Sequence, residues 1–311
     1  MSKLRNSLCE LCTALIFFCG CSNEPLQPIR SGEIWPDNNG EHINAHGGGV
    51  MYHDGTYYWF GENKCDTTSS AMVGVMCYSS RNLTDWKNEG VALSVVDNDS
   101  SDIARGCILE RPKVIYNAKT GKFVMWFHLE LKGKGYAAAR AGVAVSDTPA
   151  GPYRFIRSGR VNAGKLPVDM DGQAVAVLDT LNAKNYEKWW TPEWTDAVNK
   201  GLIVKRDLDG GQMSRDMTLY VDEDGKAYHI YSSEENLTLQ IAELSDDYLS
   251  HTRVGMLRPR SEDGRRREHT SLIGSPTGTT GSDHPVGSVF FEDSRCLIVS
   301  CRSHTHIIPC V

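Results

Sequence analysis

Residues 214–244 read SRDMTLYVDEDGKAYHIYSSEENLTLQIAEL, and this stretch decides the fold class. Apolar and polar residues alternate over 217–221, an acidic turn ending in Gly225 follows, and residues 227–231 return as a second strand. A third strand covers 237–244 and ends in another acidic turn. This order is typical of one blade of a β-propeller, with Asp216 at the inner end of its first strand.

The same order of strand, turn and strand occurs twice earlier in the chain. Residues 50–52 lead through an Asp-Gly turn into 56–60, and 112–116 lead through a longer turn into 122–128. Further strands are expected at 72–80 and 141–145. Recurring strand pairs without a helical period predict an all-β propeller.

An insertion at 161–212 separates the second repeat from the third, and residues 195–200 within it have a helical pattern. It contains Trp189, Trp190 and Trp194. These side chains either stack on a sugar as part of a lid or pack the insertion onto the propeller.

The overall composition is that of an ordinary soluble domain. The chain has 311 residues, of which 40% are hydrophobic and 23% charged, and its formal net charge is −6. Nucleic acids and anionic membrane surfaces are bound through an excess of Lys and Arg. The composition therefore argues against both partners and favours a neutral substrate.

The first 21 residues resemble a bacterial lipoprotein signal. Lys3 and Arg5 precede an apolar run at 11–18 that is too short to span a bilayer, and Gly20 precedes Cys21 as the cleavage junction. We expect a signal at 1–21, a linker at 22–40 and a lipid anchor on Cys21. The protein would then lie in the cell envelope, in the periplasm or anchored to the outer membrane, with simple secretion or cytosolic retention as alternatives.

The cysteines do not form a metal motif. The chain has no CxxC…CxxC pattern of the kind that forms a structural zinc site. Cys65, Cys77 and Cys107 are therefore expected to be buried free thiols.

Several motifs in the same order resemble glycoside hydrolase family 43, within the branch that includes exo-β-1,3-galactanases, and the resemblance covers about 41–268. The motifs are Ile43–Gly49 (INAHGGG), Phe60–Asn63 (FGEN), Leu109–Lys113 (LERPK), Ser214–Met217 (SRDM) and Ser233–Asn236 (SEEN). The resemblance implies a five-bladed β-propeller that cleaves glycosidic bonds with inversion. Inversion uses an acid and a base whose carboxyl groups lie ~6.5–9.5 Å apart.

The resemblance also implies roles for individual residues. Asp216 occupies the position of the carboxylate that raises the pKa of the general acid and binds sugar. Glu268 occupies the position of the acid itself, although His269 and Thr270 stand where the family has Ala-Pro. An exposed Glu268 following a basic run is the alternative.

The catalytic base has no obvious candidate. The first blade opens with His46 and three glycines, without the Asp of most family members, and the resembling branch recruits a glutamine from a later blade. Glu110 then becomes a further catalytic carboxylate of the pocket. Glu62 and Asn236 are hydroxyl-binding candidates, together with His46 and Arg215, and each of these could instead be structural. We expect no cofactor and no metal; calcium is possible in the family, but no ligand cluster in the sequence identifies one.

The tail at 269–311 differs in composition from the rest of the chain. It contains no Lys, Tyr or Trp, but four of the ten His and three of the ten Cys. We interpret it as an atypical, truncated or frameshifted end that leaves about three to four blades. The alternative is a divergent fourth blade with strands at 289–291 and 296–299.

The sequence therefore predicts an inverting glycosidase, most similar to exo-β-1,3-galactanases, with a polysaccharide or oligosaccharide as its partner. An α-L-arabinofuranosidase or another family 43 exo-glycosidase is one alternative. A catalytically inactive, carbohydrate-binding or decayed lipoprotein is the other.

Overall fold

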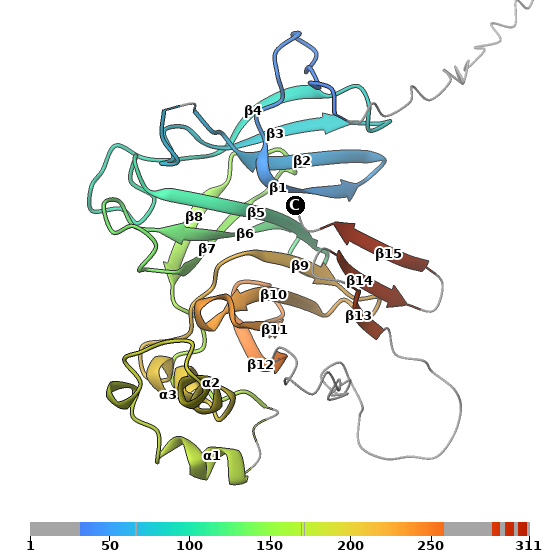
Figure 1. Cartoon of the computed structure of the whole chain (residues 1–311). Coiled ribbons are helices and arrows are strands. Elements are labelled where there is room, and N and C mark those ends of the chain that lie inside the picture. Colours follow the sequence, from blue (N-terminus) through green and yellow to red (C-terminus); the bar gives the residue numbers. More distant parts are fainter. Residues whose placement is uncertain are drawn as a thin grey trace, which may run out of the picture.

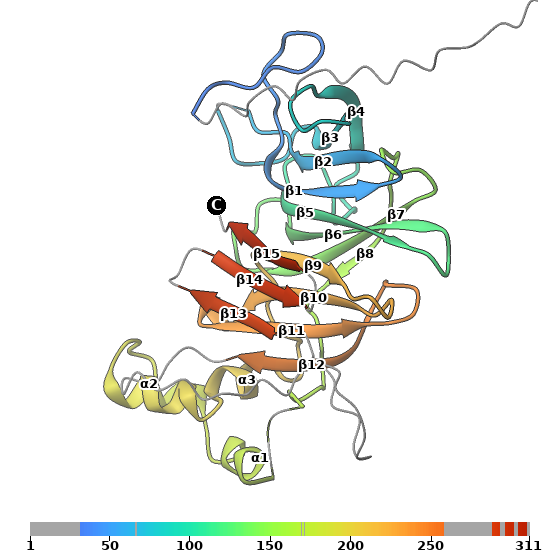
Figure 2. The same ribbon diagram turned by 90° about the vertical axis from the view of Figure 1, so that its right-hand side faces the viewer.

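The computed structural model describes residues 32–257 except 66, 169 and 171, together with the strands at 288–292, 296–301 and 304–309. The signal, Cys21 and Glu268 lie outside the described residues. Three four-stranded antiparallel sheets and one three-stranded sheet make up the described fold (Figures 1 and 2). The predicted all-β fold with about three to four blades is confirmed.

Each four-stranded sheet follows the chain as a simple meander. The first contains β1 (His46–His53), β2 (Thr56–Glu62), β3 (Gly74–Ser80) and β4 (Lys87–Ser94). The second contains β5 (Ile108–Asn117), β6 (Lys122–Glu130), β7 (Arg140–Ser146) and β8 (Arg154–Gly159). The third contains β9 (Met217–Val221), β10 (Ala227–Ser233), β11 (Thr238–Leu244) and β12 (His251–Leu257).

The C-terminal sheet contains β13 (Ser288–Glu292), β14 (Cys296–Cys301) and β15 (His304–Pro309). Its first two strands include both segments expected for a divergent fourth blade. The interpretation of 269–311 as a frameshifted end stays a prediction, since the rest of this segment lies outside the described residues.

The turns form where the sequence predicts them. His53 pairs with Thr56, and the two residues between them, Asp54 and Gly55, both have positive φ, at 48° and 78°. A two-residue hairpin with positive φ at both positions is a type I′ turn, whose twist matches that of the flanking strands. The Asp-Gly pair therefore sets the register of β1 against β2.

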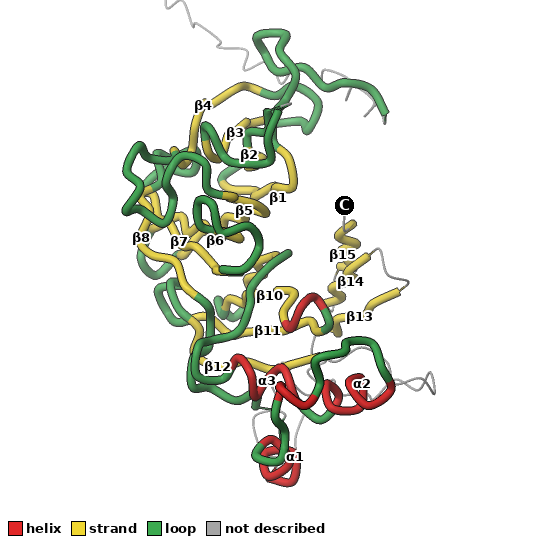
Figure 3. The backbone as a smooth tube through the Cα atoms, turned by 60° about the vertical axis from the view of Figure 1, so that its left-hand side comes forward, coloured by secondary structure: helices red, strands yellow, loops and turns green. Residues whose placement is uncertain are grey.

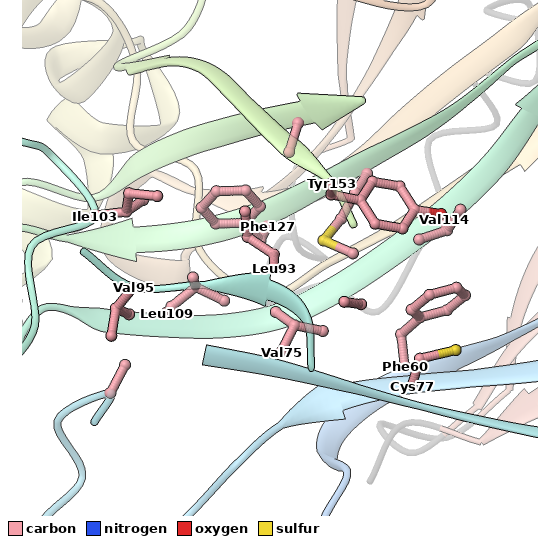
Figure 4. Packing of buried hydrophobic residues seen from close by; sticks show 14 of the residues in the cluster. Phe60, Val75, Cys77, Leu93, Val95, Ile103, Leu109, Val114, Phe127 and Tyr153 are labelled. Carbon is pink, nitrogen blue, oxygen red and sulfur yellow. The ribbon is translucent and has the colours of Figure 1, made fainter. Parts of the chain in front are cut away.

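The blades pack face to face through residues that alternate along each strand. Met125 and Phe127 of β6 belong to the core shared with the first blade (Figure 4), whereas Val124 and Trp126 face the third. Because successive side chains of a strand point to opposite faces, a central blade must be apolar on both. This explains why β6 reads as a continuous apolar run.

The insertion folds as a helical unit with its own core beside the third blade (Figure 3). Its helices are α1 (Gly172–Leu178), η1 (Ala183–Asn185), α2 (Pro192–Asn199) and α3 (Leu202–Asp207). Trp194 is buried in that core, so packing is its role. The Trp189 and Trp190 rings contact the Trp194 ring, and these two residues are 43% and 70% exposed.

The cysteine prediction is correct at two of three positions. Cys77 and Cys107 are buried between the first two blades, and burial raises the pKa of Cys107 to about 11. Cys65 is exposed, so the expectation of a buried thiol is wrong there. It lies in the irregular connection between β2 and β3, where no second layer covers it.

Candidate active site

The candidate site is built on the first strands of the three blades. Strand β5 lies against β1 on one side and against β9 on the other. His46 begins β1, Glu110 and Arg111 lie within β5, and Asp216 immediately precedes β9. Predicted site residues from three separate repeats therefore lie on neighbouring first strands of the blades.

The glycine tract of β1 allows the second blade to approach closely. A side chain at Gly48 would place its Cβ 1.5 Å from the backbone oxygen of Phe60, and one at Gly49 would meet the Lys113 side chain at 2.6 Å. Lys113 Nζ donates hydrogen bonds to the carbonyl oxygens of Gly48 (2.8 Å) and Gly47 (3.3 Å). Burial lowers the pKa of this lysine to about 8. Where most of the family has an Asp, this strand thus meets a lysine from the next blade.

Glu62 ends β2 and is buried, with 4% of its surface exposed. His46 Nδ1 lies 2.8 Å from one of its carboxyl oxygens, and Lys64 Nζ lies 2.8 Å from the other. The predicted residues Glu62 and His46 therefore meet directly. The His46 side chain is 59% exposed, so its ring can also reach a ligand.

Asp216 forms an ion pair across the blade boundary. Arg111 Nε donates to Asp216 Oδ1 at 2.6 Å, and the Asp216 side chain is 68% exposed. Arg111 has a φ of 56° and lies where the pairing of β5 with β6 slips. A β-bulge re-aims the side chains around it, which here directs Arg111 toward the third blade.

Glu110 has the most strongly shifted carboxyl group of the site. Its Oε1 accepts from the Tyr136 hydroxyl at 2.9 Å and lies 3.6 Å from Lys64 Nζ, and its Oε2 lies 3.4 Å from His128 Nδ1. Interaction with His128 is the largest cause that lowers the pKa of Glu110 to about 2, against the opposing effect of burial. Glu110 is therefore a carboxylate throughout the physiological pH range.

Arg215 and Asn236 differ in their exposure to solvent. Arg215 is largely enclosed: it donates to the Tyr136 carbonyl at 3.0 Å and lies 3.7 Å from Glu235 and 3.9 Å from Glu130. Asn236 is exposed in the turn after β10, where its side chain accepts from the Ser232 hydroxyl at 2.9 Å. This hydrogen bond ties the turn to the end of β10, and the role of Asn236 as a sugar ligand stays a prediction.

The sequence did not identify the other polar residues of the site. These residues are Lys64, Arg111, Lys113, His128, Glu130 and Tyr136. One signal was available: His128 and Glu130 are two residues apart at the end of an apolar strand, so they share one face of it. Buried ionisable side chains need a partner, and such a pair predicts one.

The described residues contain no group of three or more His, Cys, Asp or Glu side chains that could hold a metal ion. None of the helices in the described part of the chain is long and apolar enough to span a bilayer.

Solved structures with known activities resemble this chain over most of its length. A family 43 β-1,3-galactosidase, BT3683, with galactodeoxynojirimycin, is 53% identical, with a TM-score of 0.73, over 88% of this chain and 74% of that one. The chain belongs to glycoside hydrolase family 43. The predicted family is thereby confirmed.

Two further family 43 structures cover less of their own length. An exo-β-1,3-galactanase from Clostridium thermocellum is 35% identical, with a TM-score of 0.55, over 73% of this chain and 40% of that one. An exo-β-1,3-galactanase from Phanerochaete chrysosporium, with galactose, is 26% identical, with a TM-score of 0.55, over 88% of this chain and 48% of that one. No protein-family model matches the chain, and the search of curated proteins finds no match.

Proposed function

We propose that the protein is an exo-acting glycosidase that hydrolyses β-1,3-linked galactan with inversion. The observation that carries this proposal is that ion pairs connect carboxylates of three blades of a family 43 propeller. Lys64 lies 2.8 Å from Glu62 and 3.6 Å from Glu110, and Arg111, next to Glu110, pairs with Asp216 at 2.6 Å. The similar structures named for activity on β-1,3-galactosides support the choice of sugar. Hydrolysis by carboxyl groups requires no organic cofactor.

Within this proposal, Glu268 is the general acid and Glu110 keeps it protonated. A carboxylate with a pKa of about 2 is a weak base, but its permanent negative charge raises the pKa of a neighbouring acid. Asp216 forms an ion pair with Arg111, and its side chain is exposed. It is therefore suited to accept hydrogen bonds from sugar hydroxyls. The acid-tuning role that the family resemblance assigns to Asp216 stays a prediction, and in this proposal Glu110 shares it.

The test is hydrolysis by the purified full chain of β-1,3-galactan, an aryl β-galactoside and an aryl α-L-arabinofuranoside. We expect galactose release from the first two, with the α-anomer appearing first in the proton NMR spectrum because inversion reverses the β-linkage. Release only from the arabinofuranoside would contradict the proposed sugar. Binding without release from any substrate would instead indicate a carbohydrate-binding protein.

Matched glutamine variants test the roles. Removing a general acid costs roughly 10²–10⁴-fold in rate, so Glu268→Gln should lose that much kcat on galactan. Glu110→Gln should also lose activity because it removes the fixed charge. The exposed turn residue Glu223 provides the control, and Glu223→Gln should retain wild-type activity. Equal activity of all three variants would refute the assignment.

We also propose that Cys21 carries a lipid anchor and places the enzyme at the cell envelope. The support is the sequence of residues 1–21, which has a basic start, a short apolar run and a Gly-Cys junction. Labelling with a radioactive fatty acid should mark the expressed protein, and Cys21→Ala should abolish the label. An unlabelled wild-type chain would argue against the anchor.

A further inference from the structure

A buried row of charges lies behind Glu110, on the side away from solvent. His128 is 2% exposed and Glu130 is fully buried. His128 Nδ1 faces Glu110 at 3.4 Å, and His128 Nε2 lies 2.9 Å from Glu130 Oε1. One imidazole therefore spans two carboxylates, one at the site and one in the interior.

A doubly protonated ring satisfies this arrangement best when both carboxyl groups are ionised. A neutral imidazole has one N–H and could donate to only one of the two carboxylates, which would leave the other facing a lone pair. Burial disfavours the cation, but the hydrogen bonds to Glu110 and Glu130 outweigh it and raise the pKa of His128. The ring is thus an imidazolium held by charge on both sides.

Glu130 is itself fixed from several directions. Its Oε2 accepts from the backbone N–H groups of Ala138 (2.7 Å) and Ala139 (2.9 Å), and Arg215 lies 3.9 Å from its other oxygen. Burial opposes ionisation of Glu130, but His128 and the backbone N–H groups of Ala139 and Ala138 outweigh it and lower the pKa of this carboxyl group. They also tie down the segment that carries Tyr136, the other group that donates to Glu110.

We propose that His128, clamped by Glu130, is a positioning residue that holds Glu110 ionised and oriented for glycoside hydrolysis. Among the described residues, the charged and titratable groups that face this unit include Lys64 and Arg111 beside Glu110, Tyr136 beside the His128 ring, and Arg215 beside Glu130. His128 is 2% exposed, so it acts through Glu110 and not on the sugar. The inference rests on the proposed function, in which Glu110 supplies the fixed charge.

The test compares the wild type with His128→Gln and Glu130→Gln in the full chain. Glutamine at 128 keeps a hydrogen-bond donor but not the positive charge. Glutamine at 130 keeps the acceptor for the two alanine N–H groups but weakens the clamp on the imidazolium. An opposite charge nearby shifts a carboxyl pKa by roughly 1–3 units. In His128→Gln we therefore expect the acid-side inflection of kcat/KM to move up by about that amount, and in Glu130→Gln by less.

Carbon-13 NMR of the Glu110 carboxyl group supplies a readout that does not depend on activity. The pKa of Glu110 should rise in both variants in step with the kinetic inflection. The exposed His42 provides the matched control, and His42→Gln should follow the wild-type profile. An unchanged Glu110 titration together with a uniform loss of activity would overturn the inference and leave His128 a structural residue. A shifted titration in a chain that hydrolyses none of the substrates would support the charge coupling while refuting the proposed function.

Discussion

Gly48 shows how a single residue controls the approach of two strands. Its missing side chain leaves room for the backbone of β2 at Phe60, which lies where a Cβ would be. The neighbouring Gly47, with a φ of 59°, lies where the pairing of β1 with β2 slips. Together they let the carbonyl groups of β1 face the Lys113 ammonium group. At this point of the site, β1 therefore contributes no side chain. Its backbone carbonyl groups bind the Lys113 side chain of the second blade instead.

Gly48→Ala should destabilise the protein by about 1–3 kcal/mol, the usual cost of overpacking, because backbone cannot move aside as a side chain can. Gly159→Ala is the matched control: this glycine lies in strand β8, where an added Cβ would meet nothing within 4 Å and φ is not positive. It should change stability by less than about 1 kcal/mol. Urea unfolding of both variants measures the difference. Equal urea midpoints for the two variants would show that β1 and β2 can move apart to accept a Cβ without a loss of stability.

At the scale of elements, the helical insertion is a separate packing unit attached to the third blade. Its apolar core is made by its own helices, with Leu237 of the propeller packed against it. Helix α2 begins at an N-cap, where the Thr191 hydroxyl accepts from the Trp194 N–H at 3.2 Å and Pro192 follows. Proline at the first helical position costs no hydrogen bond. This start positions Trp194 toward the insertion core.

Thr191→Ala should destabilise α2 by about 1 kcal/mol, the usual cost of losing an N-cap. Thr195→Ala, at an exposed position within the same helix, should have the opposite sign, because alanine has the higher helix propensity. Amide hydrogen exchange of residues 192–199 reports both changes, while exchange in the blade cores should stay constant. Faster exchange of blade amides in Thr191→Ala would mean that the insertion and propeller unfold together.

At the scale of the whole molecule, acid stability depends on a histidine pair in the third blade. His229 Nδ1 lies 3.0 Å from His251 Nε2, and the His251 ring stacks on Trp126 of the second blade at a centroid distance of 5.2 Å. Burial lowers the pKa of His229 well below its usual range and that of His251 to about 3. Both rings are therefore neutral in the folded protein at pH values where the unfolded chain would protonate them.

Folding stability should thus fall as the pH drops below the unfolded histidine pKa of about 6.5, by roughly 1.4 kcal/mol per pH unit for each histidine. Between pH 6.5 and 4.5, Glu110 does not add to this slope, because its stabilising charge is lost only below its unfolded pKa of 4.5. His128, whose pKa is raised, contributes the opposite trend, since its stabilisation is lost only as the pH rises through its folded pKa.

His229→Phe should reduce the acid slope by about half, since it removes one of two titrating rings. The His229 Nε2 atom has no hydrogen-bond partner among the described residues, so phenylalanine leaves few groups unsatisfied. Free energies of unfolding from urea titrations at pH 4.5 to 7 measure the slope, and the exposed His42→Gln should leave it unchanged. An unaltered slope in His229→Phe would assign the acid sensitivity to other groups.

The blades and their order follow from the sequence because strands and turns depend on neighbouring residues. The alternation over 217–221 and the Asp-Gly turn at 54–55 each act within a few residues, where side-chain periodicity and allowed φ values decide the structure. The family motifs, read in order, likewise indicated the propeller and its carboxylates. The helical insertion was visible in the break of the strand pattern.

Only the tertiary structure decided which charges meet. Arg111 pairs with Asp216 although the two are 105 positions apart in the chain, and Lys113 reaches the backbone of β1 from the next blade. The pKa of a carboxyl group depends on charges within a few ångströms, and sequence distance gives no measure of that separation. Glu110 could therefore be recognised in the sequence as a site carboxylate, but the imidazolium of His128 that keeps it ionised becomes evident only when β5 and β6 lie side by side.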